Sequence, residues 1–100
     1  MIRGTTPTLT FKLPFDCADI DILNISFAQC NTVVLEKDLY DCNVKGNEIS
    51  VTLTEDDTLK FDCAESYAEV QIRVGIGERR LASQIMKISV ERVLKDGSLQ

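Results

Sequence analysis

The chain has 100 residues, 44% of them hydrophobic, which is enough for one domain with a single core (residues 1–100) and too few for two. Its formal net charge is -5 and its lysines and arginines are scattered, so we do not expect nucleic acid as a partner, because phosphate binding needs clustered cations. No apolar run approaches the ~20 residues of a membrane span. The N-terminal residues contain no apolar signal core, so we expect neither a membrane partner nor secretion by that route.

Histidine is absent from the sequence. This excludes Ser-His-Asp and Cys-His catalysis, histidine metal ligation and the usual general base near neutral pH. An enzyme would have to use carboxylates, lysine, tyrosine or cysteine alone. We therefore expect a protein that is not an enzyme and that uses no cofactor.

Four cysteines, Cys17, Cys30, Cys42 and Cys63, are spread along the chain. No two of them have the C-x-x-C spacing of a zinc knuckle or a redox motif. Without a signal peptide, we expect four reduced thiols that are at least partly buried as small apolar groups.

The first expected strand covers residues 8–13, where apolar and polar residues alternate. Pro7 and Pro14 bracket it, and proline lacks a backbone donor, so this strand is expected at a sheet edge. Gly4 and Pro7 also indicate a kink. In immunoglobulin-like sandwiches, a first strand split in this way often pairs with both sheets.

Residues 20–29 form the next expected strand, and Cys30-Asn31 a turn. In the following strand, residues 32–39, alternation places Val33, Leu35 and Leu39 on the inner face together with the charged Lys37. This mismatch suggests an edge position or a bulge, because an inward charge blunts an exposed edge.

A short strand, residues 42–45, is followed by a hairpin at Gly46-Asn47, whose residues tolerate positive φ. Residues 49–53 then alternate as a strand. Thr54 and Asp57 have the spacing of a helix capping box, so we expect one short helical turn near Thr54–Phe61.

Alternation resumes over residues 68–76 and a turn follows at Gly77-Glu78. Tyr67 precedes this strand, either as a tyrosine corner or as a half-buried strand-end tyrosine. Residues 79–94 are expected to be a strand that bends, contains a bulge or projects from the domain. The alternative is a helix over Leu81–Leu94, which β-branched residues disfavour.

About seven short strands with regular turn signals predict an all-β fold, an immunoglobulin-like antiparallel β-sandwich. Its loops carry two acidic groups, Asp16, Asp19 and Asp21, and Glu55, Asp56 and Asp57. Calcium takes several oxygen ligands, so a free-standing sandwich that binds calcium or a carbohydrate through these loops is the alternative function. Neither group has the spacing of a known calcium loop, and we expect no metal ligands.

Four segments together resemble a known family: Arg3–Phe11, Val51–Leu59, Glu69–Val74 and Ile88–Val90. They are similar to small proteins of phages and prophages of Gram-positive bacteria, and to the immunoglobulin-like N-terminal domain of phage baseplate upper proteins. That domain also has an Arg-Gly opening strand and a Leu-Thr-x-x-Asp-Thr corner. The resemblance spans nearly the whole chain and implies a structural role in the tail, baseplate or virion.

We therefore expect a non-enzymatic module of phage or prophage assembly that contacts other phage structural proteins, itself, or both. Its expected location is the bacterial host cytoplasm during assembly, with the virion as a further location. The expected contact residues lie on the first and last strands, where β-addition can occur. They are Thr8, Thr10, Lys12, Glu91 and Arg92.

Overall fold

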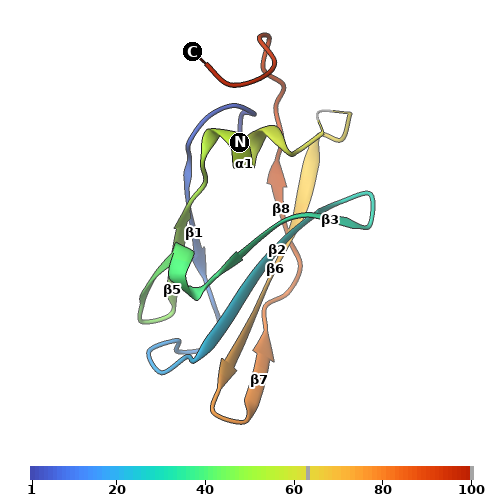
Figure 1. Ribbon diagram of the computed structural model, residues 1–100. Coiled ribbons are helices and arrows are strands. Elements are labelled where there is room, and N and C mark those ends of the chain that lie inside the picture. Colours follow the sequence, from blue (N-terminus) through green and yellow to red (C-terminus); the bar gives the residue numbers. More distant parts are fainter. Residues whose placement is uncertain (63, 100) are drawn as a thin grey trace.

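The computed structural model describes residues 1–62 and 64–99 and contains two antiparallel sheets (Figure 1). The first sheet has the order β1 (Thr8–Lys12), β5 (Glu48–Thr52), β4 (Cys42–Lys45). The second has the order β3 (Thr32–Asp38), β2 (Ile22–Gln29), β6 (Tyr67–Ile76), with both β7 (Arg79–Ala82) and β8 (Met86–Ser89) on β6. A 3₁₀ turn, η1 (Leu39–Asp41), joins β3 to β4, and a short helix, α1 (Glu55–Leu59), joins β5 to β6. The expected all-β sandwich is confirmed, including its helical turn.

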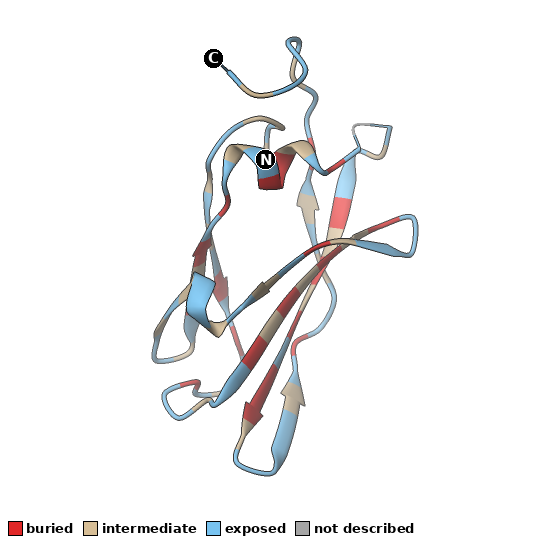
Figure 2. Cartoon of the chain, in the orientation of Figure 1, coloured by how far each residue is buried: buried red, intermediate tan, exposed pale blue. Residues whose placement is uncertain are grey.

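Apolar side chains from the inward faces of both sheets form the core. The buried residues, red in Figure 2, recur along the strands of both sheets. Alternation in β2, β5 and β6 places every second residue there, as the sequence predicts. Phe61, which follows α1, meets Phe27 of β2 edge to face, with ring centroids 5.8 Å apart and planes at 84°. The buried apolar residues are Phe11, Leu13, Cys17, Leu23, Ile25, Phe27, Leu35, Ile49, Val51, Leu53, Phe61, Ala68, Val70, Ile72, Val74 and Val90.

The N-terminal segment pairs with both sheets, as expected for a split first strand. Ile2 forms a parallel bridge to Glu91, which follows β8 in the second sheet. The Arg3 amide donates to the Glu91 carbonyl at 2.9 Å, and the Glu91 amide donates to the Met1 carbonyl at 2.8 Å. The chain turns at Gly4, where φ is +78°, and β1 then pairs with β5 at the edge of the first sheet.

A β-bulge in β3 corrects the expected placement of Val33. Phe27 of β2 pairs with Leu35, but the next residue, Ala28, pairs with Val33, so Val34 is the extra residue. Val33 therefore points outward and is 52% exposed, whereas Val34 packs against the core. The expectation of an edge position or a bulge in this strand is confirmed. The prediction that Val33 is internal was wrong, because alternation does not show which residue is the extra one.

A second bulge divides the last expected strand. Ala82 pairs with Arg73 and Met86 with Val70, so three residues, 83–85, lie opposite the two residues 71 and 72. Ser83 partly restores the ladder, since its amide donates to the Ile72 carbonyl (2.8 Å) and its Oγ accepts from the Ile72 amide (3.0 Å). The extra residue turns Ile85 outward. The prediction of a bulged strand is confirmed for residues 79–82 and 86–89, and the helical alternative is wrong. Residues 90–94, expected in the same strand, lie outside it, with only an isolated bridge at Glu91.

The inward charge expected on β3 has a partner. Lys37 Nζ lies 2.7 Å from Asp57 Oδ2, and the two side chains are only 15% and 10% exposed. Asp57 also completes the capping box of α1, because it accepts from the Thr54 amide (2.9 Å) while the Thr54 hydroxyl accepts from the Asp57 amide (3.0 Å). Burial by itself would raise the pKa of Asp57, but the hydrogen bonds from Lys37 and Thr54 outweigh it and lower the pKa.

Replacing Phe61 by alanine should lower the free energy of unfolding by about 3–5 kcal/mol, because loss of its buried ring leaves a cavity beside Phe27. Urea denaturation followed by circular dichroism measures the loss. The matched control is Tyr40→Ala, which truncates an aromatic side chain that is 96% exposed and should cost less than about 0.5 kcal/mol. Equal losses in the two variants would contradict this description of the core.

The Lys37→Met variant should lose about 3–5 kcal/mol of stability near neutral pH, because Asp57 is left buried without its cation. The wild-type contribution of Asp57 is complete above its unfolded pKa of about 3.9 and is lost as the pH falls through the lower folded pKa. The difference between wild type and variant should therefore shrink at low pH. Urea titrations between about pH 2 and pH 7 test this, and a constant difference would contradict it.

Candidate protein-contact surfaces

The outer edge of β1 presents backbone groups that pair with no other strand among residues 1–62 and 64–99. The Leu13 amide donates to the Asn47 carbonyl (2.8 Å), and the Leu53 amide donates to the Pro7 carbonyl (2.9 Å). Hydrogen-bonded pairs recur at every second residue of an antiparallel ladder, so the odd-numbered residues of β1 bond to β5. The N–H and C=O groups of Thr8, Thr10 and Lys12 therefore point away from the sheet. These are the three contact residues that we expected on the first strand.

The side chains of these residues lie on the outward surface of the first sheet and are exposed. Thr8 Oγ1 is 2.8 Å from Thr52 Oγ1, and Thr10 Oγ1 is 3.0 Å from Ser50 Oγ. These cross-strand hydroxyl pairs support the β1–β5 register. They leave the backbone edge of β1 uncovered.

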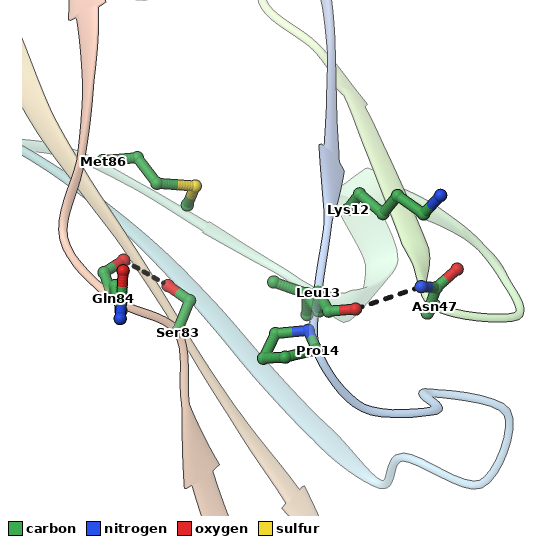
Figure 3. A pocket seen from close by; sticks show the side chains of 7 residues that line it. All are labelled: Lys12, Leu13, Pro14, Asn47, Ser83, Gln84 and Met86. Carbon is green, nitrogen blue, oxygen red and sulfur yellow. Dashed lines mark hydrogen bonds between the residues drawn. The ribbon is translucent and has the colours of Figure 1, made fainter.

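A hollow of about 510 Å³ lies at the end of this edge and is called the edge hollow below (Figure 3). Leu13 and Pro14 form one side of it, just beyond β1, while Ser83 and Met86 at the β7–β8 bulge form the other. Lys12, Asn47 and Gln84 complete the lining. We did not expect this feature from the sequence, because it needs the bulge that separates β7 from β8.

The other two expected contact residues, Glu91 and Arg92, are also exposed but lie in a different environment. The backbone of Glu91 is already bonded to Met1 and Arg3. The strand position beside Glu91 is therefore occupied by the chain's own N-terminal segment. Glu91 and Arg92 therefore lie beside the N-terminal segment and are not part of the open edge of β1.

The two acidic loops use several carboxylates within the fold. Asp16 accepts from the Ala18 amide (3.0 Å), and Asp21 accepts from the Gly77 amide (2.8 Å). Asp57 binds Lys37, and Glu55 accepts from the Leu99 amide (3.2 Å). Within residues 1–62 and 64–99, no three cysteine or carboxylate side chains gather in a way that could hold a metal ion.

Three cysteines fall within the described residues and are free. Cys17 is buried in the core and Cys42 is half-buried, but Cys30 is exposed in the β2–β3 turn, where the expectation of burial was wrong. Cys30 and Asn31 have φ of 50° and 61°, so this tight turn holds the Cys30 side chain outside the sheets. Cys63 lies outside the described residues.

The thiol environments oppose ionisation. Burial raises the pKa of Cys42 to about 11, with a smaller contribution from Asp41 and Asp38. The pKa of Cys17 is raised by burial and by Asp16. For Cys30, the hydrogen bond of its Sγ to Glu65 Oε1 (2.6 Å) is the main reason that the pKa is raised. These environments disfavour a thiolate nucleophile at any of the three positions.

Tyr67 does not form the buried tyrosine corner that was one reading of its position. It is exposed at the start of β6, and Lys87 Nζ of β8 lies 4.6 Å from its ring centroid. This cation–π contact stays on the outward surface of the second sheet. The alternative, a strand-end tyrosine, describes it better.

Comparison with models of known protein families, with curated proteins and with solved structures gave no significant match. Within the described part of the chain, no helix has the length and apolar character needed to cross a membrane.

Cys42 should react slowly with iodoacetamide near pH 8, and its rate should keep rising up to a pH of about 11, because only the thiolate reacts and burial disfavours it. Mass spectrometry of quenched samples measures the modification at each cysteine, and the urea-unfolded chain provides the reference rates. Rapid modification of folded Cys42 near neutral pH would contradict the raised pKa.

Proposed function

We propose that this protein is a non-enzymatic, immunoglobulin-like module that assembles with structural proteins of a phage or prophage particle through protein–protein contacts. The open edge of β1 carries the proposal. A partner strand can pair with the outward N–H and C=O groups of Thr8, Thr10 and Lys12 and so extend the first sheet. The edge hollow beside Leu13 and Met86 offers a place for an apolar side chain from that strand.

The four sheet edges differ in how easily they accept a strand. β3 and the β7–β8 pair each contain a bulge, and a bulge interrupts regular pairing. β4 has only four residues. β1 has five residues, pairs with β5 in an unbroken register, and carries only one charged side chain, Lys12. This comparison favours β1 as the edge that a partner uses.

The order of the strands supports the immunoglobulin-like part of the proposal. One sheet has the order β1-β5-β4 and the other β3-β2-β6-β7, with α1 at the crossover from the first to the second. If β1 corresponds to strand B, the sheets read B-E-D and C′-C-F-G, the arrangement of immunoglobulin-type sandwiches. On this assignment, the first strand is reduced to the segment around Ile2, which forms a parallel bridge to Glu91 beside the second sheet.

Two observations support a role without catalysis. The sequence has no histidine, and burial or neighbouring carboxylates raise the pKa of the three described thiols. The resemblance of Arg3–Phe11 and Val51–Leu59 to baseplate upper proteins is what directs the proposal to phage particles.

Replacing Thr10 by proline should abolish binding to phage structural proteins while leaving the sandwich folded. Proline removes the outward N–H of Thr10, which a partner strand needs, but no bond of the β1–β5 ladder. The measurement is co-purification with tail and baseplate proteins from particle-producing cells, quantified by mass spectrometry. Circular dichroism and thermal melting check that the variant is folded.

Thr10→Val is the matched control, because it changes the same side chain and keeps the backbone donor. It should bind like the wild type. Equal binding by the proline variant would show that β1 is not the contact edge. Failure of the wild type to bind any structural protein of the particle would refute the proposed function itself.

A further inference from the structure

The two sheets differ in what they expose on their outward surfaces. The outward residues of β1, β5 and β4 are polar, for example Thr8, Thr10 and Thr52. The outward side of β3, β2, β6, β7 and β8, called the outer face below, instead exposes large apolar and aromatic side chains. They are Ile22 (56% exposed), Val33 (52%), Ile85 (59%) and Tyr67 (39%).

The two bulges create the centre of this outer face. One turns Val33 outward on β3, and the other turns Ile85 outward between β7 and β8. Between them lies a hollow of about 290 Å³, lined among others by the small residues Ser26 and Ala28 and by Gln71. Apolar side chains grouped around a hollow on an otherwise polar surface are typical of a contact site.

The charged residues of the outer face indicate which partner binds there. Its outward residues include three bases, Arg73, Arg80 and Lys87, and three acids, Glu36, Asp38 and Glu69. The face is therefore neutral, although the chain carries -5. The charges are also unevenly distributed, because Glu36 and Asp38 lie on β3 at one side, whereas the three bases and the single acid Glu69 lie on β6, β7 and β8.

We propose that the outer face binds the outer face of a second copy of this chain, forming a two-fold symmetric dimer. A two-fold axis along the strands places β3 of one copy against β7 and β8 of the other. In both halves of the interface, the negative β3 side of one copy then faces the more positive β6–β8 side of the other, so the two surfaces are complementary in charge. Val33 of one copy lies level with Lys87 of the second, next to Ile85 on the same face, and the hollow receives apolar side chains of the facing copy.

Sedimentation equilibrium of the 100-residue chain over a range of concentrations tests this proposal. The wild type should form a dimer, and higher salt should weaken it, because exposed charges are screened. Ile85→Asp should raise the dimer dissociation constant by at least about tenfold, as expected for a central apolar contact. Thr52→Asp, which adds the same charge to the outward side of the other sheet, should leave it unchanged.

The charge pairing has its own test. Glu36→Arg and Arg73→Glu should each weaken the dimer, because each reduces the charge complementarity between the β3 side and the β6–β8 side, and the double variant should recover the wild-type constant. Melting curves verify that every variant is folded. A monomer at all concentrations, a dimer indifferent to Ile85→Asp, or a double variant weaker than both single variants would overturn the proposal. Because phage proteins are absent from this measurement, its failure leaves the β1 contact unaffected.

Discussion

The short helix α1 joins the two sheets, and its contacts connect three parts of the chain that are distant in sequence. Asp57 caps α1 through Thr54 and binds Lys37 on β3 of the second sheet. Thr58 donates to the Thr5 carbonyl (2.9 Å) and accepts from the Gly4 amide (2.9 Å), which places the N-terminal segment between the sheets' ends. A buried ion pair repays the loss of hydration only when all its hydrogen bonds are made. The ion pair therefore fixes β3 against the start of α1. The hydrogen bonds of Thr58 fix the path of the N-terminal segment into β1.

This arrangement determines which edges of the two sheets are covered and which are open. The N-terminal segment reaches Glu91 and covers the end of the second sheet, and then leaves it at Gly4 to enter β1. Nothing in the described residues continues along the outer side of β1, so its backbone groups stay open. On β3 and on the β7–β8 pair, by contrast, the bulges interrupt the regular pairing that a partner strand would need. The same bulges turn Val33 and Ile85 outward, so protection of these edges and formation of the outer face have one structural cause.

Much of the fold can be predicted from short-range patterns, because alternation, turn residues and capping boxes depend on neighbours in the sequence. The strands at residues 48–52 and 67–76, the Cys30-Asn31 turn and the Thr54–Asp57 cap are examples. The open edge at Thr8, Thr10 and Lys12 could also be predicted, because Pro7 and Pro14 bracket this strand. A bulge was among the expectations for both edge strands, but the outward placement of Val33 and Ile85 could not be predicted, because the register against the partner strand decides which residue is extra. The signals that remained were Lys37 on an apolar face and the opposite parities of Ile85 and Met86.

The β1 edge and the outer face belong to different sheets, so both can be occupied at once. A dimer joined through Val33 and Ile85 would keep the β1 edge of each copy open. Two such edges related by a two-fold axis make attachment bivalent, and the second contact then forms at a high effective concentration. Weak β-addition at the three-stranded sheet of one copy would become firm attachment when both copies engage. The small area of a single edge strand is thus compatible with a structural role, because the affinity would come from the pair and not from either edge alone.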